Sequence, residues 1–139
     1  AMTIDLLPTI AHLTKAKLPE HTIDGQNVWP LFTEGGAVSP QEAYYLYYGN
    51  QLQAVRQGKW KLHFPHGYRT MAGKPGGTGG IPTNYSQAKI GLSLFDLRQD
   101  VGESKDLKEQ YPKIVQRLSQ LGKVFDESLK RNKRPVGKI

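Results

Sequence analysis

The chain has 139 residues, of which 37% are hydrophobic and 22% are charged. This length and composition predict one globular domain, spanning residues 1–139, with a core of modest size. The sequence contains no cysteine, which excludes disulfides, thiolate metal ligands and cysteine nucleophiles. We also expect no membrane span, because no apolar run is long enough to cross a bilayer.

The formal net charge is +7, and much of the excess lies near the C-terminus. The basic residues there alternate with apolar ones, as on the solvent-facing side of a helix: Lys108, Lys113, Arg117, Lys123, Lys130, Arg131, Lys133, Arg134 and Lys138. We favour this interpretation over nucleic-acid binding, which we do not expect. Attraction of an anionic substrate is a third interpretation of the same charge.

The first predicted element is a short N-terminal helix from Asp5 to Lys15, where apolar residues recur at helical spacing. Thr3 or Asp5 can cap its first turn. Pro8 is compatible with that turn, because its missing amide hydrogen has no intrahelical acceptor there.

An irregular apolar segment follows from Thr22 to Phe32. Asp24-Gly25 predicts a turn within it, and a polar loop comes next. We expect Trp29, Leu31 and Phe32 to pack and not to bind a ligand.

From residue 42 onward the hydrophobic period changes to two, which predicts strands over residues 42–48, 52–57 and 59–64. In the third strand Trp60, Leu62 and Phe64 share one face, and Lys59, Lys61 and His63 share the other. This alternation is typical of an antiparallel sheet with one face in water.

Residues 92–97 supply a fourth predicted strand, and a turn leads from it toward the last helix. From Pro112 to about Arg131 the apolar residues follow steps of four and three, so one stripe can cover the sheet. The sequence therefore predicts an α+β fold: a four-stranded antiparallel sheet with a long C-terminal helix packed on one face, and a short N-terminal helix.

The segment from Pro65 to Gly91 is predicted to be a long glycine-rich loop, and such loops are usually either functional or flexible spacers. His66, Arg69 and Lys74 are its candidate substrate-binding residues, since their side chains can position an anion or stack on a sugar ring. Arg69 is preferred because a guanidinium can donate two hydrogen bonds to sulfate or carboxylate oxygens. A surface ion pair is the alternative role for Arg69.

No other motif supports a phosphate-binding, metal-binding or nucleophilic role. The spacing from Gly67 to Lys74 does not fit a phosphate-binding loop, and His63 with His66 lacks a third metal ligand at suitable spacing. Ser93 has no G-x-S-x-G context. The sequence thus offers no catalytic residue and no metal site.

Three blocks are informative when taken together: Asp5-Leu6-Leu7-Pro8-Thr9, Gly58-Lys59-Trp60-Lys61-Leu62, and the stretch from Leu94 to Leu107 that includes Asp100-Val101-Gly102-Glu103. In this order they resemble the C-terminal end of sulfatases of the arylsulfatase A type. In that family a D-L-x-P-T helix opens the segment, and an R-x-G-K-W-K-L hairpin precedes an L-[FY]-D-L strand. A D-x-x-E turn and a closing helix follow that strand.

The resemblance implies that the complete protein hydrolyses sulfate esters of a small molecule or carbohydrate in an N-terminal catalytic domain. That domain would carry calcium and a formylglycine made from the cysteine or serine of a C/S-x-P-x-R motif. The motif is absent here, so no catalytic or metal residue is carried over and no cofactor is expected in this chain. The smaller C-terminal subdomain would lie beside the active-site mouth, with the predicted loop 65–91 nearest to it.

Three hypotheses follow. The preferred one is a C-terminal fragment of a sulfatase, which supports the catalytic domain, helps shape its substrate pocket and is inactive alone. The second is a stand-alone anion-binding or carbohydrate-binding module, and the third is a purely structural domain. By resemblance the complete protein would be periplasmic or secreted, and the isolated chain is expected to self-associate through its apolar surface.

Overall fold

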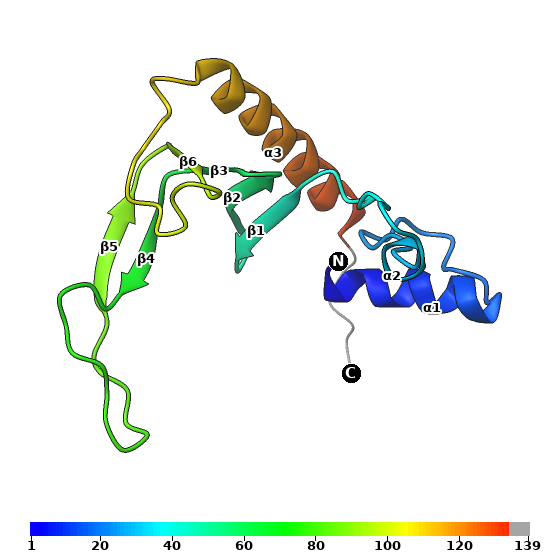
Figure 1. Ribbon diagram of the computed structural model, residues 1–139, viewed down its shortest axis with the longest axis horizontal. Helices are drawn as coiled ribbons and strands as arrows, with labels where there is room; N and C mark the ends of the chain where they lie inside the picture. Colours follow the sequence, from blue (N-terminus) through cyan, green and yellow to red (C-terminus); the bar gives the residue numbers. More distant parts are fainter. Residues whose placement is uncertain (134–139) are drawn as a thin grey trace. The chain divides into compact units, whose positions relative to one another are not determined.

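The computed structural model describes residues 1–133 (Figure 1). The described residues divide into two compact units: residues 1–44 with residues 131–133, and residues 45–130. Each unit is described by itself below, and the single domain expected over residues 1–139 stays a prediction. Two of the basic residues named above, Arg134 and Lys138, lie outside the described residues.

The N-terminal unit begins with a short 3-10 helix, η1 (Thr3–Asp5), that continues into α1 (Leu6–Thr14). The helix predicted from Asp5 to Lys15 is therefore confirmed. Lys15 ends it in the left-handed conformation, with a φ of 58°, and the amide of Ala16 donates to the carbonyl of Ala11 at 2.9 Å.

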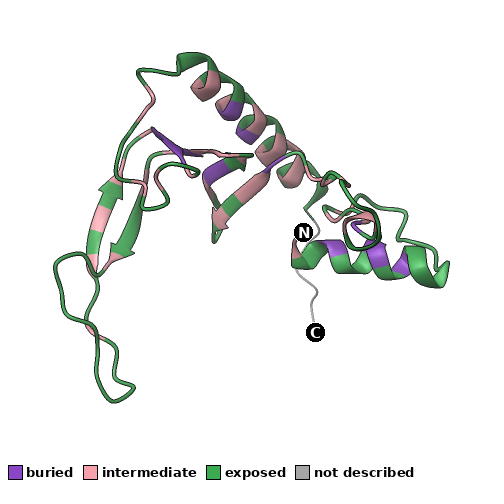
Figure 2. Cartoon of the chain, in the orientation of Figure 1, coloured by how far each residue is buried: buried purple, intermediate pink, exposed green. Residues whose placement is uncertain are grey.

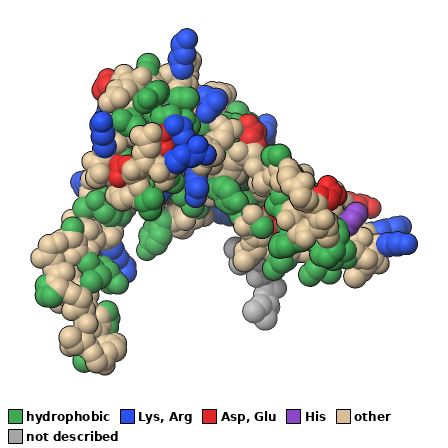
Figure 3. Space-filling view, viewed as in Figure 1, with side chains coloured by type: hydrophobic (Ala, Val, Ile, Leu, Met, Phe, Trp, Pro, Cys, Tyr) green, Lys and Arg blue, Asp and Glu red, His purple; other side chains and the backbone are tan. Residues whose placement is uncertain are grey.

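Only one side of α1 is covered within its unit, as Figure 2 shows. Pro8, Thr9 and Ala11 are buried. Hydrophobic side chains on the other side are about half exposed: Leu6 58%, Leu7 55%, Ile10 55% and Leu13 48%. Figure 3 shows hydrophobic side chains gathered on the surface of this part of the chain. We call these four residues the α1 apolar stripe.

The segment after α1 differs from the prediction. It contains a helical turn, α2 (Pro30–Thr33), with proline at its start. Trp29 is 38% exposed and Phe32 69% exposed, so neither ring is covered within this unit, and the expectation that both pack stays a prediction. Their rings lie 6.4 Å apart, because a four-residue helix can bring them together but offers no second layer to cover them.

The second unit is built on a four-stranded sheet, which confirms the predicted strands. Its spatial order is β1 (Tyr44–Tyr48), β2 (Gln51–Gln57), β3 (Trp60–His63) and β6 (Ser93–Asp96), and β3 pairs antiparallel with both of its neighbours. The register sets Val55 opposite Leu62 and Leu62 opposite Leu94. These three side chains share one face and are 0% exposed.

The long helix α3 (Pro112–Asn132) covers that face, as predicted (Figure 1). Leu118 is fully buried, and burial of such a side chain stabilises the fold by about 2 kcal/mol. The ring of Phe125 stacks on Tyr45 at 3.7 Å. A Cβ on Gly122 would lie 2.7 Å from Phe64 Cζ and 3.0 Å from Val55 Cγ2, so glycine is what allows the helix to approach the sheet this closely.

The other face of the sheet is less exposed to solvent than predicted. Phe95 on this face is 4% exposed and Ala54 is 1% exposed, while the side chains of Lys61 and His63 are 18% and 12% exposed. The turn after β6 covers this face and supplies an acidic partner for both residues. The alternation in the sequence identified the residues of this face, but it could not show that the turn after β6 covers them.

The segment from Pro65 to Gly91 is not an irregular loop throughout, which corrects the prediction. It holds a second antiparallel sheet, β4 (His66–Thr70) with β5 (Ser86–Ile90). No residue of either strand is fully buried, and only β5 alternates, with Ala88 and Ile90 on one face and Gln87 and Lys89 on the other. Irregular chain remains only between the two strands, apart from an isolated bridge of Thr78 with Ile81.

Candidate functional site

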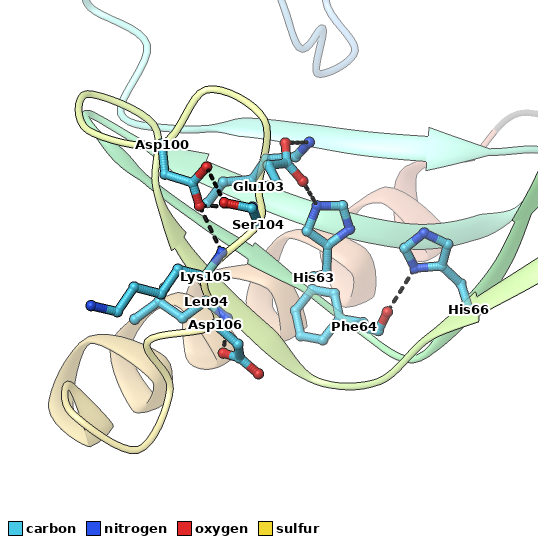
Figure 4. A network of polar contacts seen from close by, with 10 residues as sticks. His63, Phe64, His66, Leu94, Asp100, Glu103, Ser104, Lys105 and Asp106 are labelled. Atoms are coloured by element: carbon cyan, nitrogen blue, oxygen red, sulfur yellow. Dashed lines mark hydrogen bonds and ion pairs between the residues drawn. The ribbon is translucent and has the colours of Figure 1, made fainter. Parts of the chain in front are cut away.

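Two of the three sequence blocks are joined by ion pairs in the second unit, and Figure 4 shows the contact of His63 with Glu103. Lys59 Nζ donates to Asp96 Oδ2 at 2.6 Å. Lys61 Nζ donates to Glu103 Oε1 at 2.5 Å, and His63 Nε2 lies 2.6 Å from Glu103 Oε2. The basic residues of the G-K-W-K-L hairpin are thus paired with the acidic residues of the L-F-D-L strand and its turn.

The turn that carries Glu103 is held by Asp100. Its carboxylate accepts hydrogen bonds from the amides of Ser104, at 2.7 Å, and Lys105, at 2.8 Å, and from the Ser104 hydroxyl at 3.0 Å. Glu103 itself has a φ of 54°, a left-handed conformation that costs about 1 kcal/mol for a residue with a side chain. Asp100 therefore fixes a strained turn that aims Glu103 back at β3.

The electrostatics of the network suit a structural role. Burial alone would raise the pKa of Glu103, but hydrogen bonds and charge from Lys61 and His63 outweigh it and hold the pKa below its ordinary value. Burial and the Lys61 cation lower the pKa of His63, and its contacts with Glu103 oppose this only in part. His63 Nδ1 is buried without a hydrogen-bond partner among the described residues, so a second ring proton would be left unsatisfied.

The third block, Asp5 to Thr9, organises the N-terminal unit in a similar way. Asp5 is 0% exposed, and its carboxylate accepts from the amides of Met2 and Gln26 and from Gln41 Nε2, at 2.7, 3.0 and 2.7 Å. Thr9 Oγ1 donates to the Asp5 carbonyl at 2.7 Å and accepts from the Val28 amide at 3.0 Å. Asp5 at the end of η1 and Thr9 on α1 thus join the start of the chain to residues 26–28 and to Gln41.

The candidate residues His66, Arg69 and Lys74 do not form one cluster. His66 lies on β4 with its Nδ1 2.7 Å from the Phe64 carbonyl oxygen (Figure 4), and Lys74 Nζ donates to the Asn84 carbonyl at 2.9 Å. Arg69, also on β4, forms no ion pair within residues 1–133, so the alternative role of an ion pair gains no support there. A part for the three residues in substrate binding stays a prediction.

Arg69 does line a groove of about 380 Å³ on the second unit. The remaining lining comes from β1, β2, β4 and β5: Tyr48, Gln53, Gly67, Tyr68 and Gln87. Among these lining residues Arg69 carries the only charge. We call this the Arg69 groove.

Residues 1–133 contain no group of three or more His, Cys, Asp or Glu side chains placed to hold a metal ion. No helix among them is both long and apolar enough to cross a membrane.

Comparison with known proteins identifies the family, and the match includes the second and third blocks. Residues 39–139 match the family described as the C-terminal region of aryl-sulfatase. The chain belongs to this family. The resemblance seen in the sequence is thereby confirmed.

Proteins that are similar to this chain over most of its length are also named as sulfatases. Human arylsulfatase A is 33% identical over 134 residues, covering 87% of this chain, and bovine arylsulfatase A is 34% identical over the same share. Mouse steryl-sulfatase is 31% identical over 75% of the chain. The chain spans 25% of the length of either arylsulfatase A, so it corresponds to only a quarter of such a protein.

A solved structure from work on glycosaminoglycan metabolism by Bacteroides thetaiotaomicron has the same fold. It superposes with a TM-score of 0.63 at 23% identity, covering 88% of this chain and 24% of that one. This likeness concerns the fold alone.

In this aryl-sulfatase C-terminal region, basic residues of the second block form ion pairs with acidic residues of the third block. Sequence reasoning identified Lys59, Lys61, Asp96 and Glu103 only as parts of a resemblance, and it assigned them no contacts. It placed His63 in solvent, whereas His63 is mostly buried beside Glu103. The opposite charges of the G-K-W-K and D-x-x-E blocks were the signal available to predict their pairing.

Proposed function

We propose that the chain works as the C-terminal part of a sulfatase, where it supports a preceding catalytic domain and helps shape the substrate pocket. The observation that carries this proposal is the family match over residues 39–139, in a chain that spans a quarter of its arylsulfatase relatives. In this proposal the catalytic domain holds calcium and the formylglycine nucleophile. Neither would be held by this chain.

The α1 apolar stripe supports the proposal of a covering domain. Four hydrophobic side chains along one side of a single helix, each about half exposed, make an unusually continuous apolar surface for a monomer. Trp29 and Phe32 add exposed aromatic rings in the same unit. A catalytic domain that packs on this surface would remove it from water.

The test of the proposal is the polypeptide that precedes residue 1. Its coding region should contain C/S-x-P-x-R, and the complete protein should hydrolyse 4-nitrophenyl sulfate when formylglycine is formed. Alanine in place of the cysteine or serine of that motif should abolish turnover. A coding region without the motif would refute the proposal and favour the stand-alone anion-binding or carbohydrate-binding module.

The isolated chain should not hydrolyse an aryl sulfate, with or without added calcium. It has no cysteine and no C/S-x-P-x-R serine from which formylglycine could form, and residues 1–133 offer no cluster of metal ligands. Release of 4-nitrophenol measures this directly. Turnover that survives purification to homogeneity, and that follows the protein through two different columns, would contradict the prediction.

The isolated chain should self-associate through the α1 apolar stripe. Replacing Leu7 and Ile10 together with lysine should restore a monomer, because each is more than half exposed and neither fills the core. Lys15→Glu, at the end of the same helix, is the control for altered surface charge. Sedimentation equilibrium measures the mass, and a strictly monomeric wild-type chain at high concentration would argue against the prediction.

A further inference from the structure

We propose that a pocket beside α3 binds a small aromatic carboxylate. The pocket has a volume of about 450 Å³, within the range of small-molecule sites, and it lies wholly within the second unit. α3 supplies part of its lining, between Ser119 and Lys130, and residues 50–52 with Phe64 supply the rest. We call it the α3 pocket. It shares no lining residue with the Arg69 groove, and the inference goes beyond the proposed function without depending on it.

The floor of the α3 pocket is apolar. It is made by Leu52, Phe64 and Gly122. Leu52 and Phe64 are only half-buried, so each keeps apolar surface that a ligand can cover. Gly122 has no side chain, which brings the backbone of α3 close to the Phe64 ring. A flat apolar ring is the ligand group that suits this floor, because it can pack on Phe64 and against the helix at the same time.

The charged residues of the α3 pocket favour an anion. Asp126 is the only acidic residue of the lining, and it is already paired. Lys130 Nζ donates to Asp126 Oδ2 at 2.6 Å, and the Tyr47 hydroxyl donates to Asp126 Oδ1 at 3.0 Å. Lys123 also lines the pocket and forms no ion pair within residues 1–133. One positive charge is therefore left uncompensated beside an apolar floor.

Neutral hydrogen-bond donors lie in the same lining. The amide group of Asn50 and the hydroxyl of Ser119 have no partner within the described residues. Gln51 Nε2 donates only a long bond of 3.4 Å to the Pro65 carbonyl, which a ligand oxygen can replace at little cost. Donors are thus available from the turn between β1 and β2 and from α3, and a carboxylate has lone pairs for several of them.

The balance of charge favours a monovalent carboxylate over a phosphate or a sulfate. A lysine ammonium is a compact point charge and lacks the planar fork with which an arginine holds two oxygens of one anion. A divalent anion would meet one free cation, Lys123, and would also lie in a pocket that contains the Asp126 carboxylate. A single negative charge on a flat ring therefore matches the α3 pocket best.

Ser119 offers a way to fill the α3 pocket without changing its charge. The side chain of Ser119 is half-buried and makes no contact that the fold requires among the described residues. Leucine has a higher helix propensity than serine, so Ser119→Leu should fold normally while its larger side chain occupies the pocket. Gln120→Leu is the matched control, because Gln120 is exposed on the same turn of α3 and lies outside the lining.

The test is a titration of the ¹⁵N-labelled chain with phenylacetate, followed by NMR. Saturable shifts are expected at the amides of Asn50, Ser119 and Gly122. Phenylacetamide has the same ring without the charge, and acetate has the charge without the ring, so each should bind at least about fivefold more weakly.

The variants separate the contribution of charge from that of shape. Lys123→Gln should weaken phenylacetate binding at least about fivefold and bring its affinity close to that of phenylacetamide. Lys113→Gln, the same change of charge at an exposed position of α3 outside the lining, should leave binding unchanged. Ser119→Leu should abolish binding, and Gln120→Leu should not affect it.

Three results would overturn the inference. The first is the absence of saturable shifts at the α3 pocket in a chain whose spectrum is folded. The second is equal affinity of wild type for phenylacetate and phenylacetamide, which would remove the role of Lys123. The third is phenylacetate binding by folded Ser119→Leu that equals wild type, which would place the ligand elsewhere.

Discussion

Asp5→Asn should lower the free energy of unfolding of the N-terminal unit by about 2–4 kcal/mol. Both Asp5 oxygens are acceptors: Oδ2 accepts from the Met2 amide, and Oδ1 accepts from the Gln26 amide and Gln41 Nε2. An asparagine must turn its own amide group toward one of these sides. One donor would then face another donor in a site with no access to water.

Urea unfolding and hydrogen exchange of the Gln26 and Val28 amides measure the effect of Asp5→Asn. Asp24→Asn is the matched control, since it removes the same charge from an exposed side chain in the same unit and should change stability by less than about 0.5 kcal/mol. Equal stability of the two variants would contradict the structural role assigned to Asp5.

The Asp5 variant should also respond differently to acid. Burial alone would raise the pKa of Asp5, but the hydrogen bonds from Gln26, Met2 and Gln41 hold it below its ordinary value of 3.8. A carboxyl whose folded pKa is lowered stabilises the fold above its unfolded pKa, and that contribution is lost as pH falls through the folded value. Wild type should therefore lose stability below about pH 4, and Asp5→Asn should lose less.

The strands and the long helix could be predicted because their burial is periodic. Trp60, Leu62 and Phe64 alternate with polar residues, and α3 carries an apolar residue at each third or fourth position. Burial then follows from the pattern, since Leu62 and Leu118 are 0% exposed.

The hairpin of β4 and β5 could not be predicted in the same way. Gly67 and Arg69 are exposed on one face, and the opposite face is polar or only partly covered. The period-two signal of this ribbon is confined to the five residues of β5, which is too short to identify a hairpin across a long glycine-rich connection. The Arg69 groove shares this limit, because Tyr48, Gln53 and Gln87 come together only through the pairing of separate strands.

The contacts of Glu103 could not be predicted from the sequence either. The D-x-x-E block predicted a turn, but Glu103 reaches Lys61 and His63, which lie 42 and 40 positions earlier. Only the register of β3 with β6 brings them together. A motif can thus identify a family while its physical purpose appears only in the fold.

Glu103→Gln should lower the free energy of unfolding of the second unit by about 1–3 kcal/mol. Each Glu103 oxygen has a different basic partner, so a glutamine must turn its amide group toward either Lys61 or His63. It also leaves the Lys61 ammonium, whose side chain is 18% exposed, without an opposite charge. Glu109→Gln, an equal change of charge at an exposed position, is the control and should be nearly neutral.

The pH dependence distinguishes loss of this network from a general loss of packing. His63 has a folded pKa below its ordinary value of 6.5, so the unfolded chain binds the proton first and wild-type stability falls as pH drops below about 6.5. Contacts with Glu103 raise the His63 pKa, and removing them lowers the folded value further. Glu103→Gln should therefore lose more stability than wild type between about pH 7 and pH 5. Urea titrations at several pH values measure this difference, and parallel curves for the two proteins would mean that Glu103 does not act on His63.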